Sequence, residues 1–297
     1  MDGELIEQVR RFNRRATLAA RVLDDGYLQR GRPLAEARLI YEIGADGAEV
    51  RELRGRLGLD SGYFSRLLRS LEAQGLARVG KSTADGRLRR VELTAEGTGE
   101  RQHYDRLSDD LARSILAPLD AVQRQRLVAA MSEVERLMRA AAVEIALEPP
   151  ASADAQWCLG EYFRELSARF DAGFDPARNG ASVSEEEMTP PAGFFFIARL
   201  DGRPVGCGAL KCVGGVGEIK RMWTAASARR LGLARRMLRT LEATARENGF
   251  ETLRLDTNRA LPEAHALYRR EGFVETAPFN AQPYAHFWFE KTLPPGA

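Results

Sequence analysis

The segment RRLGLARRML, residues 229–238, places Arg side chains around one glycine at the start of a helical pattern. A strand-like run, EIKRMWTAASA, precedes it, and LRTLEATARENGF continues it as a helix. At such a junction the free backbone N–H groups and the helix dipole attract an anion, and small residues let that anion approach the backbone. Gly232 and Ala234 are such residues. The pattern favours a pyrophosphate-bearing small molecule over duplex DNA, and a helix start with solvated Arg side chains is the alternative.

The spacing excludes two other phosphate-binding motifs. RRLGLA lacks both the GxGxxG spacing of dinucleotide-binding folds and the Lys of a P-loop. Downstream, ETLRLDTN predicts a strand that ends in polar residues, and EAHALYRREGF predicts a helix that ends at Gly272. Phe273 then begins a further strand.

This order of elements resembles the GNAT superfamily of acetyl-CoA-dependent N-acetyltransferases over about residues 142–293. Arg229-x-x-Gly232-x-Ala234 matches the family's (Arg/Gln)-x-x-Gly-x-(Gly/Ala) pyrophosphate loop, with Ala in place of the commoner Gly. The run ALY…GF matches the motif that supplies a Tyr beside the coenzyme sulfur, here Tyr268, and Asn258 matches a polar residue near the pantetheine. The resemblance implies an α/β fold with a mixed, V-splayed sheet and acetyl-CoA between two central strands. It implies a cofactor site of Met222, Thr224, Arg229, Arg230, Leu231, Gly232, Leu233, Ala234, Arg235 and Asn258.

Direct transfer of an acetyl group to an amine needs a base, because an ammonium has no lone pair with which to attack the thioester. Glu218 is the candidate, since the family commonly has a Glu at this place, often acting through water. In a regular strand Glu218, Met222 and Thr224 would share the side that faces the cofactor. A structural ion pair with a neighbouring Lys or Arg is the alternative for Glu218.

Two further groups have expected roles in the transfer. A backbone N–H of Met222 or Thr224 would polarise the thioester carbonyl. Tyr268 would protonate the leaving thiolate, and a core Tyr with a satisfied hydroxyl is the alternative. The acyl acceptor is weakly marked, in RFDAGFDPARN and NAQPYAHFWFEK, where the fold usually builds its acceptor site. The candidates there are Asp171, Asp175, Tyr284 and His286.

The first half contains a helix-turn-helix pattern. A short helix from Val50 to Leu57, a Gly58-Leu59-Asp60 turn and a helix from Ser61 follow one another. Phe64, Leu67, Leu68 and Leu71 fall on one face of the last helix. Its other face can enter a major groove, with an ordinary solvated face as the alternative. That outward face carries Ser61, Tyr63, Ser65, Arg66 and Arg69.

Two strand patterns, ARVGK and RLRRVELT, follow that helix and are joined by the turn-rich STADGR. Arg87, Arg89 and Arg90 make the tip of this hairpin basic, as suits a wing that contacts phosphates or the minor groove. Residues of about 5–142 resemble the MarR family of winged-helix regulators. The segments that carry the resemblance are LDSGYFSRLLRSLEAQGLARV, the wing Asp85-Gly86-Arg87 and VELTAEG. The resemblance implies a homodimer, joined through the first and last long helices, on a palindromic operator in double-stranded DNA.

Length and composition fit two domains. The chain has 297 residues, and its character changes after AAVEIALEPPAS, which predicts a winged-helix domain over 1–141 and an acetyltransferase domain over 142–297. Long amphipathic helices are expected from Leu5 to Arg30 and from Tyr104 to Ala142, the latter split near Pro118. A net charge of +2 does not by itself indicate a nucleic-acid binder.

Neither a metal site nor a disulfide framework is expected. The three cysteines, Cys158, Cys207 and Cys212, are odd in number and lack metal-ligand spacing. No run of 18 apolar residues occurs, so a cytoplasmic protein without a membrane span is the expectation.

The predicted fold is a mainly α winged helix-turn-helix domain followed by an α/β GNAT domain with a mixed sheet. The predicted function is a DNA-binding transcriptional regulator that also transfers acetyl from acetyl-CoA directly to an amine, a pairing known within one polypeptide. One alternative is a regulator whose GNAT-like domain only senses acetyl-CoA or a metabolite. Another is an acetyltransferase whose winged helix serves only in dimerisation or protein docking.

Overall fold

The chain forms two compact units in the computed structural model, which describes residues 2–22, 27–81, 88–171, 173–176 and 183–294. Contacts divide the units between Ser132 and Glu133, inside a helix, whereas the change in composition places the boundary near residue 142. Among the described residues, no helix is long and apolar enough to cross a membrane.

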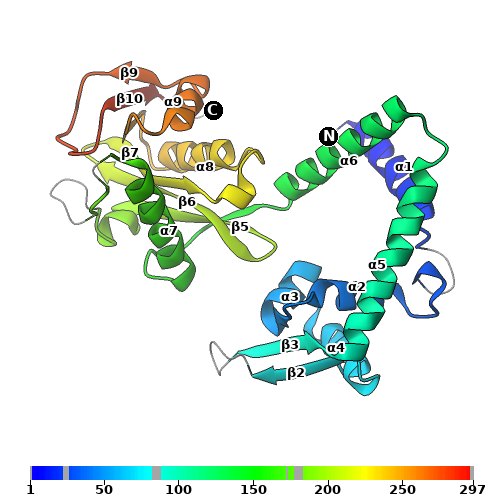
Figure 1. The fold of residues 1–297 in the computed structure, drawn as a ribbon. Coiled ribbons are helices and arrows are strands. Elements are labelled where there is room, and N and C mark those ends of the chain that lie inside the picture. The colour runs from blue at the N-terminus through cyan, green and yellow to red at the C-terminus, as the bar shows by residue number, and fades with distance from the viewer. Residues whose placement is uncertain (1, 23–26, 82–87, 172, 177–182, 295–297) are drawn as a thin grey trace. The chain divides into compact units, whose positions relative to one another are not determined.

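The first unit is mainly helical, with one small sheet (Figure 1). Its elements are α1 (Gly3–Ala19), a 3-10 turn (Tyr27–Gln29), α2 (Leu34–Ile43), β1 (Ala48–Glu49), α3 (Val50–Leu57), α4 (Ser61–Ala73), β2 (Ala77–Lys81), β3 (Arg89–Leu93), α5 (Ala95–Leu116) and α6 (Ala121–Ala141). The strands pair antiparallel in the order β1-β3-β2. The expected break near Pro118 is confirmed, because α5 ends and α6 begins on either side of it.

One helix prediction is wrong. The apolar periodicity from Leu5 to Arg30 is not one helix, because α1 ends at Ala19 and Arg21 has a left-handed backbone with φ 52°. A left-handed residue cannot continue a right-handed helix. The chain therefore turns before the short 3-10 segment at Tyr27–Gln29.

Local signals explain the helix-turn-helix. Gly58 ends α3 in the left-handed conformation that glycine favours, with φ 62°. Asp60 then caps α4 by accepting a hydrogen bond from the backbone N–H of Tyr63 at 2.9 Å. The predicted apolar face of α4 is buried in the core of this unit, and its members are Phe64, Leu67, Leu68 and Leu71.

The second unit is an α/β domain with one mixed sheet. Its elements are β4 (Glu144–Leu147), α7 (Ala153–Arg169), a 3-10 turn (Glu186–Met188), β5 (Gly193–Leu200), β6 (Arg203–Val213), β7 (Val216–Thr224), a 3-10 turn (Ala226–Ala228), α8 (Leu233–Glu247), β8 (Thr252–Thr257), α9 (Pro262–Arg270), β9 (Val274–Thr276) and β10 (Phe287–Thr292). The strand order is β4-β5-β6-β7-β8-β10-β9. Only the β7–β8 pair is parallel among the described strands.

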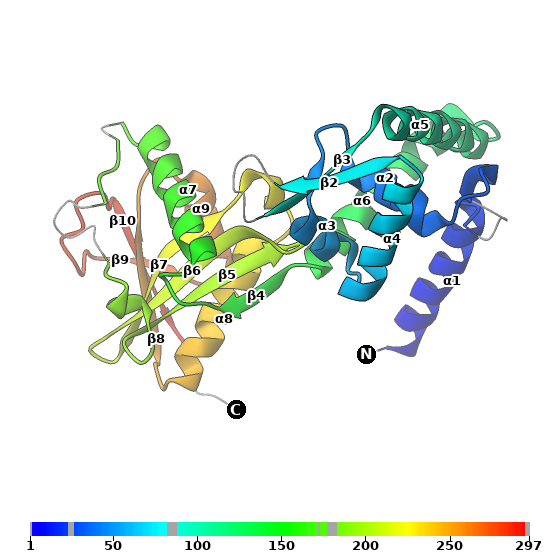
Figure 2. The same cartoon turned by 90° about the horizontal axis from the view of Figure 1, so that it is seen from below.

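Helices cover both faces of this sheet. Figures 1 and 2 show α7 on one face and α8 on the other. The larger apolar core lies beneath α8 and α9 and includes Leu238, Leu255 and Phe289, whereas a smaller one lies beneath α7 and includes Cys158 and Ile197. Asp201-Gly202 stands between two strand patterns, which predicts a hairpin turn, and the structure contains this turn between β5 and β6 with left-handed backbone at both residues.

The sheet splits between β7 and β8. These strands pair at only two positions, Gly217 with Leu253 and Glu218 with Arg254. The rest of β7 pairs with β6 alone, and the rest of β8 pairs with β10. The opening between the two strands is the V-splay that the resemblance implies, and both cavities described below lie in it.

Candidate active site

A groove of about 850 Å³ lies at the N-terminus of α8. Gly232 is the N-cap residue of α8, it has a left-handed backbone with φ 72°, and no side chain caps this helix end. The first N–H groups of a helix have no partner within the helix, so here they are available to an anion. Residues Gly232 to Arg235 line the groove. The sequence expectation of an anion site at this junction therefore has the matching geometry.

Contacts from neighbouring elements hold the loop that precedes α8. Arg136 of α6 donates a hydrogen bond to the carbonyl oxygen of Arg230 at 2.9 Å, and Arg139 donates to that of Ser227 at 3.3 Å. Arg236 of α8 donates to the carbonyl oxygen of Val143 at 2.7 Å. Arg230 has φ 63°, a strained value for a residue other than glycine. These contacts favour the strained loop conformation.

Two of the groove's arginines form ion pairs within the protein. Arg229 donates to both carboxylate oxygens of Glu165, at 2.7 and 2.8 Å. Arg235 forms an ion pair with Glu271 at 2.7 Å. Acids therefore balance much of the positive charge at this junction, so the backbone N–H groups would contribute more to the binding of an anion.

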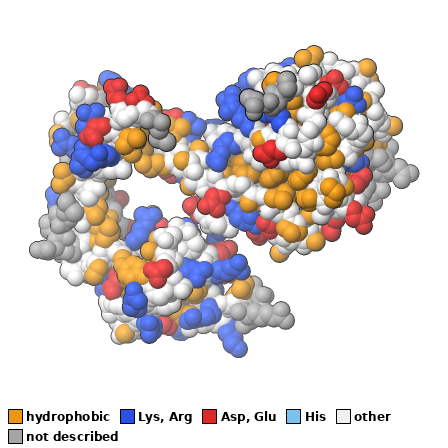
Figure 3. Space-filling view, turned by 180° about the vertical axis from the view of Figure 1, so that it is seen from behind, with side chains coloured by type: hydrophobic (Ala, Val, Ile, Leu, Met, Phe, Trp, Pro, Cys, Tyr) orange, Lys and Arg blue, Asp and Glu red, His pale blue; other side chains and the backbone are white. Residues whose placement is uncertain are grey.

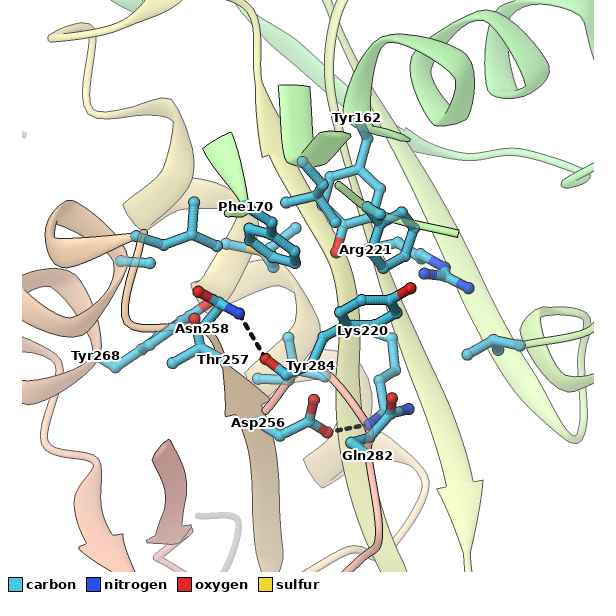
Figure 4. Close-up of a pocket in the computed structure, with 17 residues that line it drawn as sticks. Tyr162, Phe170, Lys220, Arg221, Asp256, Thr257, Asn258, Tyr268, Gln282 and Tyr284 are labelled. Atoms are coloured by element: carbon cyan, nitrogen blue, oxygen red, sulfur yellow. Dashed lines mark hydrogen bonds and ion pairs between the residues drawn. The ribbon is translucent and has the colours of Figure 1, made fainter. Parts of the chain in front are cut away.

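A smaller cavity of about 100 Å³ adjoins the groove. Its walls come from α7, the chain after α7, β7, the end of β8, α9 and the chain before β10 (Figure 4). We call it the inner pocket. Six residues line both cavities, namely Tyr162, Leu166, Met222, Leu261, Ala264 and Tyr268. The two cavities therefore meet around Met222 and Tyr268.

The expectation that Glu218, Met222 and Thr224 share one face is wrong, because β7 is not a regular strand. Its pairing with β6 shifts between Cys207 and Ala209, and Arg221 has φ 54°. This is a β-bulge, in which one extra residue reverses the alternation of side chains beyond it.

The bulge separates Glu218 from the cavities. Met222 lies on the α8 side of the sheet, because a Cβ on Gly208 would meet both Met222 and Met237. The carboxylate of Glu218 lies on the opposite face, 3.5 Å from the Nζ atom of Lys220, and it lines neither cavity. The alternative reading, an ion pair with a neighbouring cation, is therefore present in the structure.

Tyr268 lies where the two cavities meet. Its side chain is buried, and its ring packs against Phe273 and Phe289. Burial raises the pKa of its hydroxyl far above the usual value of about 10, and the nearby Tyr162 and Asp256 add to the rise. Among the described residues its hydroxyl has no hydrogen-bond partner. The hydroxyl is therefore neutral at physiological pH and can donate to an atom in the cavity.

The other predicted cofactor residues divide into three groups. Eight line the groove, namely Met222, Thr224, Arg229, Arg230, Gly232, Leu233, Ala234 and Arg235. Leu231 lies in the apolar core and lines neither cavity. Asn258 lines the inner pocket, where its amide donates to the Tyr284 carbonyl at 2.7 Å and accepts from the N–H of Ala260 at 2.9 Å.

Of the four acceptor-site candidates, Tyr284 lines the inner pocket. Its hydroxyl accepts a hydrogen bond from the backbone N–H of Asp175 at 3.0 Å. Asp171 forms an exposed ion pair with Arg259 at 2.8 Å, and His286 is exposed.

Among the described residues, no group of His, Cys, Asp and Glu side chains has the arrangement of a metal site.

Sequence reasoning missed most of the inner pocket. Tyr162, Phe170, Lys220, Arg221 and Asp256 all line it. The signal for Asp256 was its place at the polar end of the strand pattern ETLRLDTN. Tyr162 had no local signal, because only the packing of α7 against the sheet brings it here, whereas Phe170 lies in RFDAGFDPARN, a segment expected to contribute to the acceptor site.

The candidate DNA surface lies on α4 and the wing. Ser61, Ser65, Arg66 and Arg69 are exposed, and Tyr63 is half-buried with the guanidinium of Arg66 5.6 Å from its ring centre. Figure 3 shows several Lys and Arg side chains on one face of this region. Arg89 is exposed at the start of β3, and Arg87 lies outside the described residues.

Comparison with known proteins identifies both parts of the chain. The model of the GNAT acetyltransferase family matches residues 159–273, and that of the MarR family matches residues 30–88. An IAA acetyltransferase from Azospirillum brasilense is 35% identical over 144 residues, which cover 48% of this chain and 90% of that protein. The chain belongs to the GNAT acetyltransferase family.

Other GNAT relatives and solved structures resemble single parts of the chain. The uncharacterized N-acetyltransferase YsnE of Bacillus subtilis is 36% identical over 35% of this chain and 71% of its own length. The PaiA N-acetyltransferase of Thermoplasma acidophilum, solved with coenzyme A, is 18% identical with a TM-score of 0.40, over 50% of this chain and 99% of its own. Streptococcus pneumoniae FabT, solved with DNA, is 16% identical with a TM-score of 0.38, over 46% of this chain and 95% of its own.

Membership of the GNAT family establishes the general activity. The protein is an acyltransferase of the N-acetyltransferase type, and acetyl-CoA is its acetyl donor. With the MarR match, it is a MarR–GNAT fusion whose N-terminal region has the general role of a DNA-binding regulator. The geometry fits the donor, because the uncapped N-terminus of α8 opens into a groove that leads to Tyr268.

Replacing Gly232 by Ala should weaken acetyl-CoA binding by about tenfold or more, because the methyl group would occupy space that the pyrophosphate needs next to the backbone. The matched control is Gly249→Ala, just beyond the other end of α8, where φ is 77°. A Cβ meets nothing within 4 Å at either position, so both variants incur the same left-handed backbone strain of about 1 kcal/mol.

Isothermal titration calorimetry with acetyl-CoA and a urea unfolding curve would separate affinity from stability. Equal stability losses with an affinity loss only in Gly232→Ala are expected. Unchanged affinity in both variants would rule out close backbone approach at Gly232.

Proposed function

We propose that the protein transfers acetyl from acetyl-CoA directly to a small amine, and that its MarR-type region binds double-stranded DNA as a homodimer on a palindromic operator. The observation that carries the first part is the meeting of the groove and the inner pocket at Met222 and Tyr268. A donor in one cavity and an acceptor in the other would bring their reacting atoms together there. No acyl-enzyme is needed when both substrates reach one point.

Acetyl-CoA, when bound, supplies an activated thioester. The N-terminus of α8 would hold its pyrophosphate, and β7 would guide the pantetheine past Thr224 to Met222. The backbone N–H of Met222 or Thr224 would polarise the thioester carbonyl, because negative charge develops on that oxygen during attack. The bulge supports this role, since it turns Met222 toward the groove.

Tyr268 would stabilise the departing sulfur. Its raised pKa means that the hydroxyl holds its proton more tightly than a thiol with a pKa of about 8.5. Donating a hydrogen bond to the thiolate is therefore more favourable than complete proton transfer. This refines the sequence expectation, in which Tyr268 protonates the sulfur.

The amine's proton would leave through the carboxylates behind Lys220. The ammonium group of Lys220 lies between Glu218, 3.5 Å away, and Asp256, with which it also forms an ion pair. Asp256 faces the inner pocket, so it can accept the proton from the amine, directly or through water. Glu218 would act only indirectly, through Lys220.

Replacing Tyr268 by Phe should lower kcat by about 10²-fold, because the ring keeps its packing while the donor to sulfur is lost. The affinity for acetyl-CoA should change by less than about twofold, since the contacts that Tyr268 makes equally in the ground state and the transition state are retained. The rate of free CoA thiol release from acetyl-CoA with a panel of amines measures kcat. Calorimetry measures the affinity for acetyl-CoA.

The pH profile provides the control. The hydroxyl of Tyr268 is protonated throughout pH 7 to 10 because its pKa is raised, so its ionisation should cause no fall in rate below pH 10 in the parent. Equal losses of rate and affinity in Tyr268→Phe would make this Tyr structural. An unchanged rate in Glu218→Gln would remove Glu218 from the mechanism.

The DNA-binding proposal rests on the exposed polar face of α4 and on the basic wing. In this geometry α4 would read bases in the major groove, whereas Arg89 on the wing would contact phosphates. Replacing Arg89 by Ala should lower the salt dependence of binding, d log K/d log [salt], by about 1 per protomer on any duplex. Replacing Arg66 should instead change the preference among sequences.

A salt titration on duplexes selected from a random pool distinguishes these effects. Arg113→Ala is the control, because Arg113 is exposed on α5 and pairs with Asp110 at 2.7 Å, away from α4 and the wing. A uniform loss from Arg66→Ala and Arg89→Ala alike would refute the division of roles. No salt-dependent binding at all would refute the DNA-binding proposal.

The homodimer proposal rests on two helices, α1 and α6, in which no residue is fully buried within one chain. No residue of α1 or α6 is buried, and all residues of both helices are described. Both expose large apolar side chains. A second copy would cover them, as a helix of this length gains its stability from packing an apolar face. The exposed set includes Leu5, Val9 and Phe12 on α1 and Val122, Val128 and Met131 on α6.

Sedimentation equilibrium of the full chain should therefore show a dimer at micromolar concentration. Phe12→Ala should weaken it by about tenfold or more, because it removes a large apolar contact. Arg14→Ala, on the same helix and paired with Glu7, should have little effect. A monomeric parent would contradict the proposal.

A further inference from the structure

Arg221 is a buried cation in the wall of the inner pocket. Its side chain is 8% exposed, and the guanidinium lies beside the pocket in Figure 4. The bulge that places it there requires φ 54°, a conformation that costs about 1 kcal/mol or more for a residue other than glycine. Burial of a charge is also unfavourable unless other groups interact with it. A strained, buried cation beside a cavity is a candidate for ligand recognition.

Two aromatic rings lie close to this guanidinium. Its central carbon lies 4.9 Å from the ring centre of Phe163 and 5.8 Å from that of Tyr162, both on α7. Stacking engages the face of the guanidinium, whereas its N–H donors point outward within its plane. A guanidinium has five such donors, so it can bind a carboxylate through two of them while it keeps its contacts within the protein.

The charges of the inner pocket favour an anionic group at Arg221. Its described lining carries two cations, Lys220 and Arg221, and one acid, Asp256. The carboxylate of Asp256 already interacts with Lys220 and accepts a hydrogen bond from Asn280 at 3.1 Å. Asp256 and Glu218, 3.5 Å away behind the pocket, balance the charge of Lys220, so the positive charge of the described lining lies at Arg221.

The positions of the groups suggest how an acceptor would lie. Figure 4 shows Tyr268 and Arg221 on opposite sides of the inner pocket. An amine near Tyr268 and Met222 would be in position to attack the thioester, which leaves the opposite end of the molecule near Arg221. Phe170 and Tyr284 line the space between and would contact its carbon atoms. A cavity of about 100 Å³ accommodates a compact molecule.

We propose that the acetyl acceptor is a small amino acid, whose carboxylate binds Arg221 while its amine faces Tyr268. This inference rests on the proposed acetyl transfer and adds the acceptor's chemical class. The reaction then balances simply, because the amine nitrogen forms a bond to the acetyl carbon and the carbon–sulfur bond breaks. The neutral amine and acetyl-CoA give an N-acetylamino acid and CoA thiol, and the one proton released overall is the proton that the ammonium form loses before the attack.

The test compares acceptors that differ only in the carboxylate. The twenty amino acids are assayed for CoA thiol release from acetyl-CoA, and each one that is turned over is compared with its amide and its decarboxylated amine. Polyamines and short peptides complete the panel. The assays cover pH 7 to 10, because these amines differ in pKa. The amino acid should have a kcat/KM at least about 10²-fold above its two analogues, because the analogues lack the carboxylate that Arg221 would bind.

Variants of Arg221 assign the preference to this residue. Arg221→Gln should reduce the ratio between amino acid and amide to near one, mainly through KM, and Arg221→Lys should restore part of it. Arg254→Gln is the matched control. Arg254 lies on the neighbouring strand β8, pairs with Glu290 at 2.8 Å and lies 5.2 Å from the ring centre of Phe279, but it lines neither cavity. The Arg254→Gln variant should have the same ratio of kcat/KM between amino acid and amide as the parent.

Each outcome has a distinct meaning. Equal or faster turnover of the decarboxylated amines or polyamines would overturn this inference and leave the acetyl-transfer proposal intact. No CoA release with any acceptor would overturn the acetyl-transfer proposal itself. Both Arg221 variants could fail to bind acetyl-CoA in calorimetry. In that case the parent's ratio of kcat/KM between the amino acid and its two analogues still decides whether the acceptor class is correct.

Discussion

The separation of β7 from β8 is the constraint on which the second unit depends. Two paired positions hold the strands together at Gly217 and Glu218, and beyond them each strand pairs only with its other neighbour. The open edges form the space in which the groove and the inner pocket meet. α8 begins at the same end of the sheet, so its uncapped N–H groups face that space. A continuous β7–β8 ladder would remove both cavities.

The bulge at Arg221 then decides which side chain faces which cavity. It turns Met222 toward α8 and Arg221 toward α7. Two features of β6 accommodate it. The Cys207 thiol donates to the Arg221 carbonyl at 3.3 Å, and Gly208 leaves room for Met222, since a Cβ there would lie 3.2 Å from the Met222 sulfur and 2.8 Å from Met237. The conformation of β7 is therefore determined jointly with the sequence of β6.

The sequence was informative where structure is determined locally. The apolar periodicity of α4, the turn at Gly58 and the Asp201-Gly202 turn depend on near neighbours, and the structure contains each of them, whereas the periodicity from Leu5 to Arg30 overestimated the length of α1. Motif spacing likewise located Gly232 and Tyr268. The bulge was not predictable from β7 alone, because one extra residue is defined only by the partner strand. The inner pocket was missed for a related reason, since its walls come from segments far apart in the chain.

The arginines around Gly232 show why residue type alone is weak evidence. Among the 44 Lys and Arg residues only four are Lys, so an Arg is this chain's ordinary cation. Arg229 and Arg235 pair with acids, and Arg236 binds a backbone carbonyl. Their charge therefore stabilises the loop and the first turn of α8 at least as much as it attracts a ligand. We infer that the donor's pyrophosphate is recognised mainly by backbone N–H groups, which the arginines hold in position.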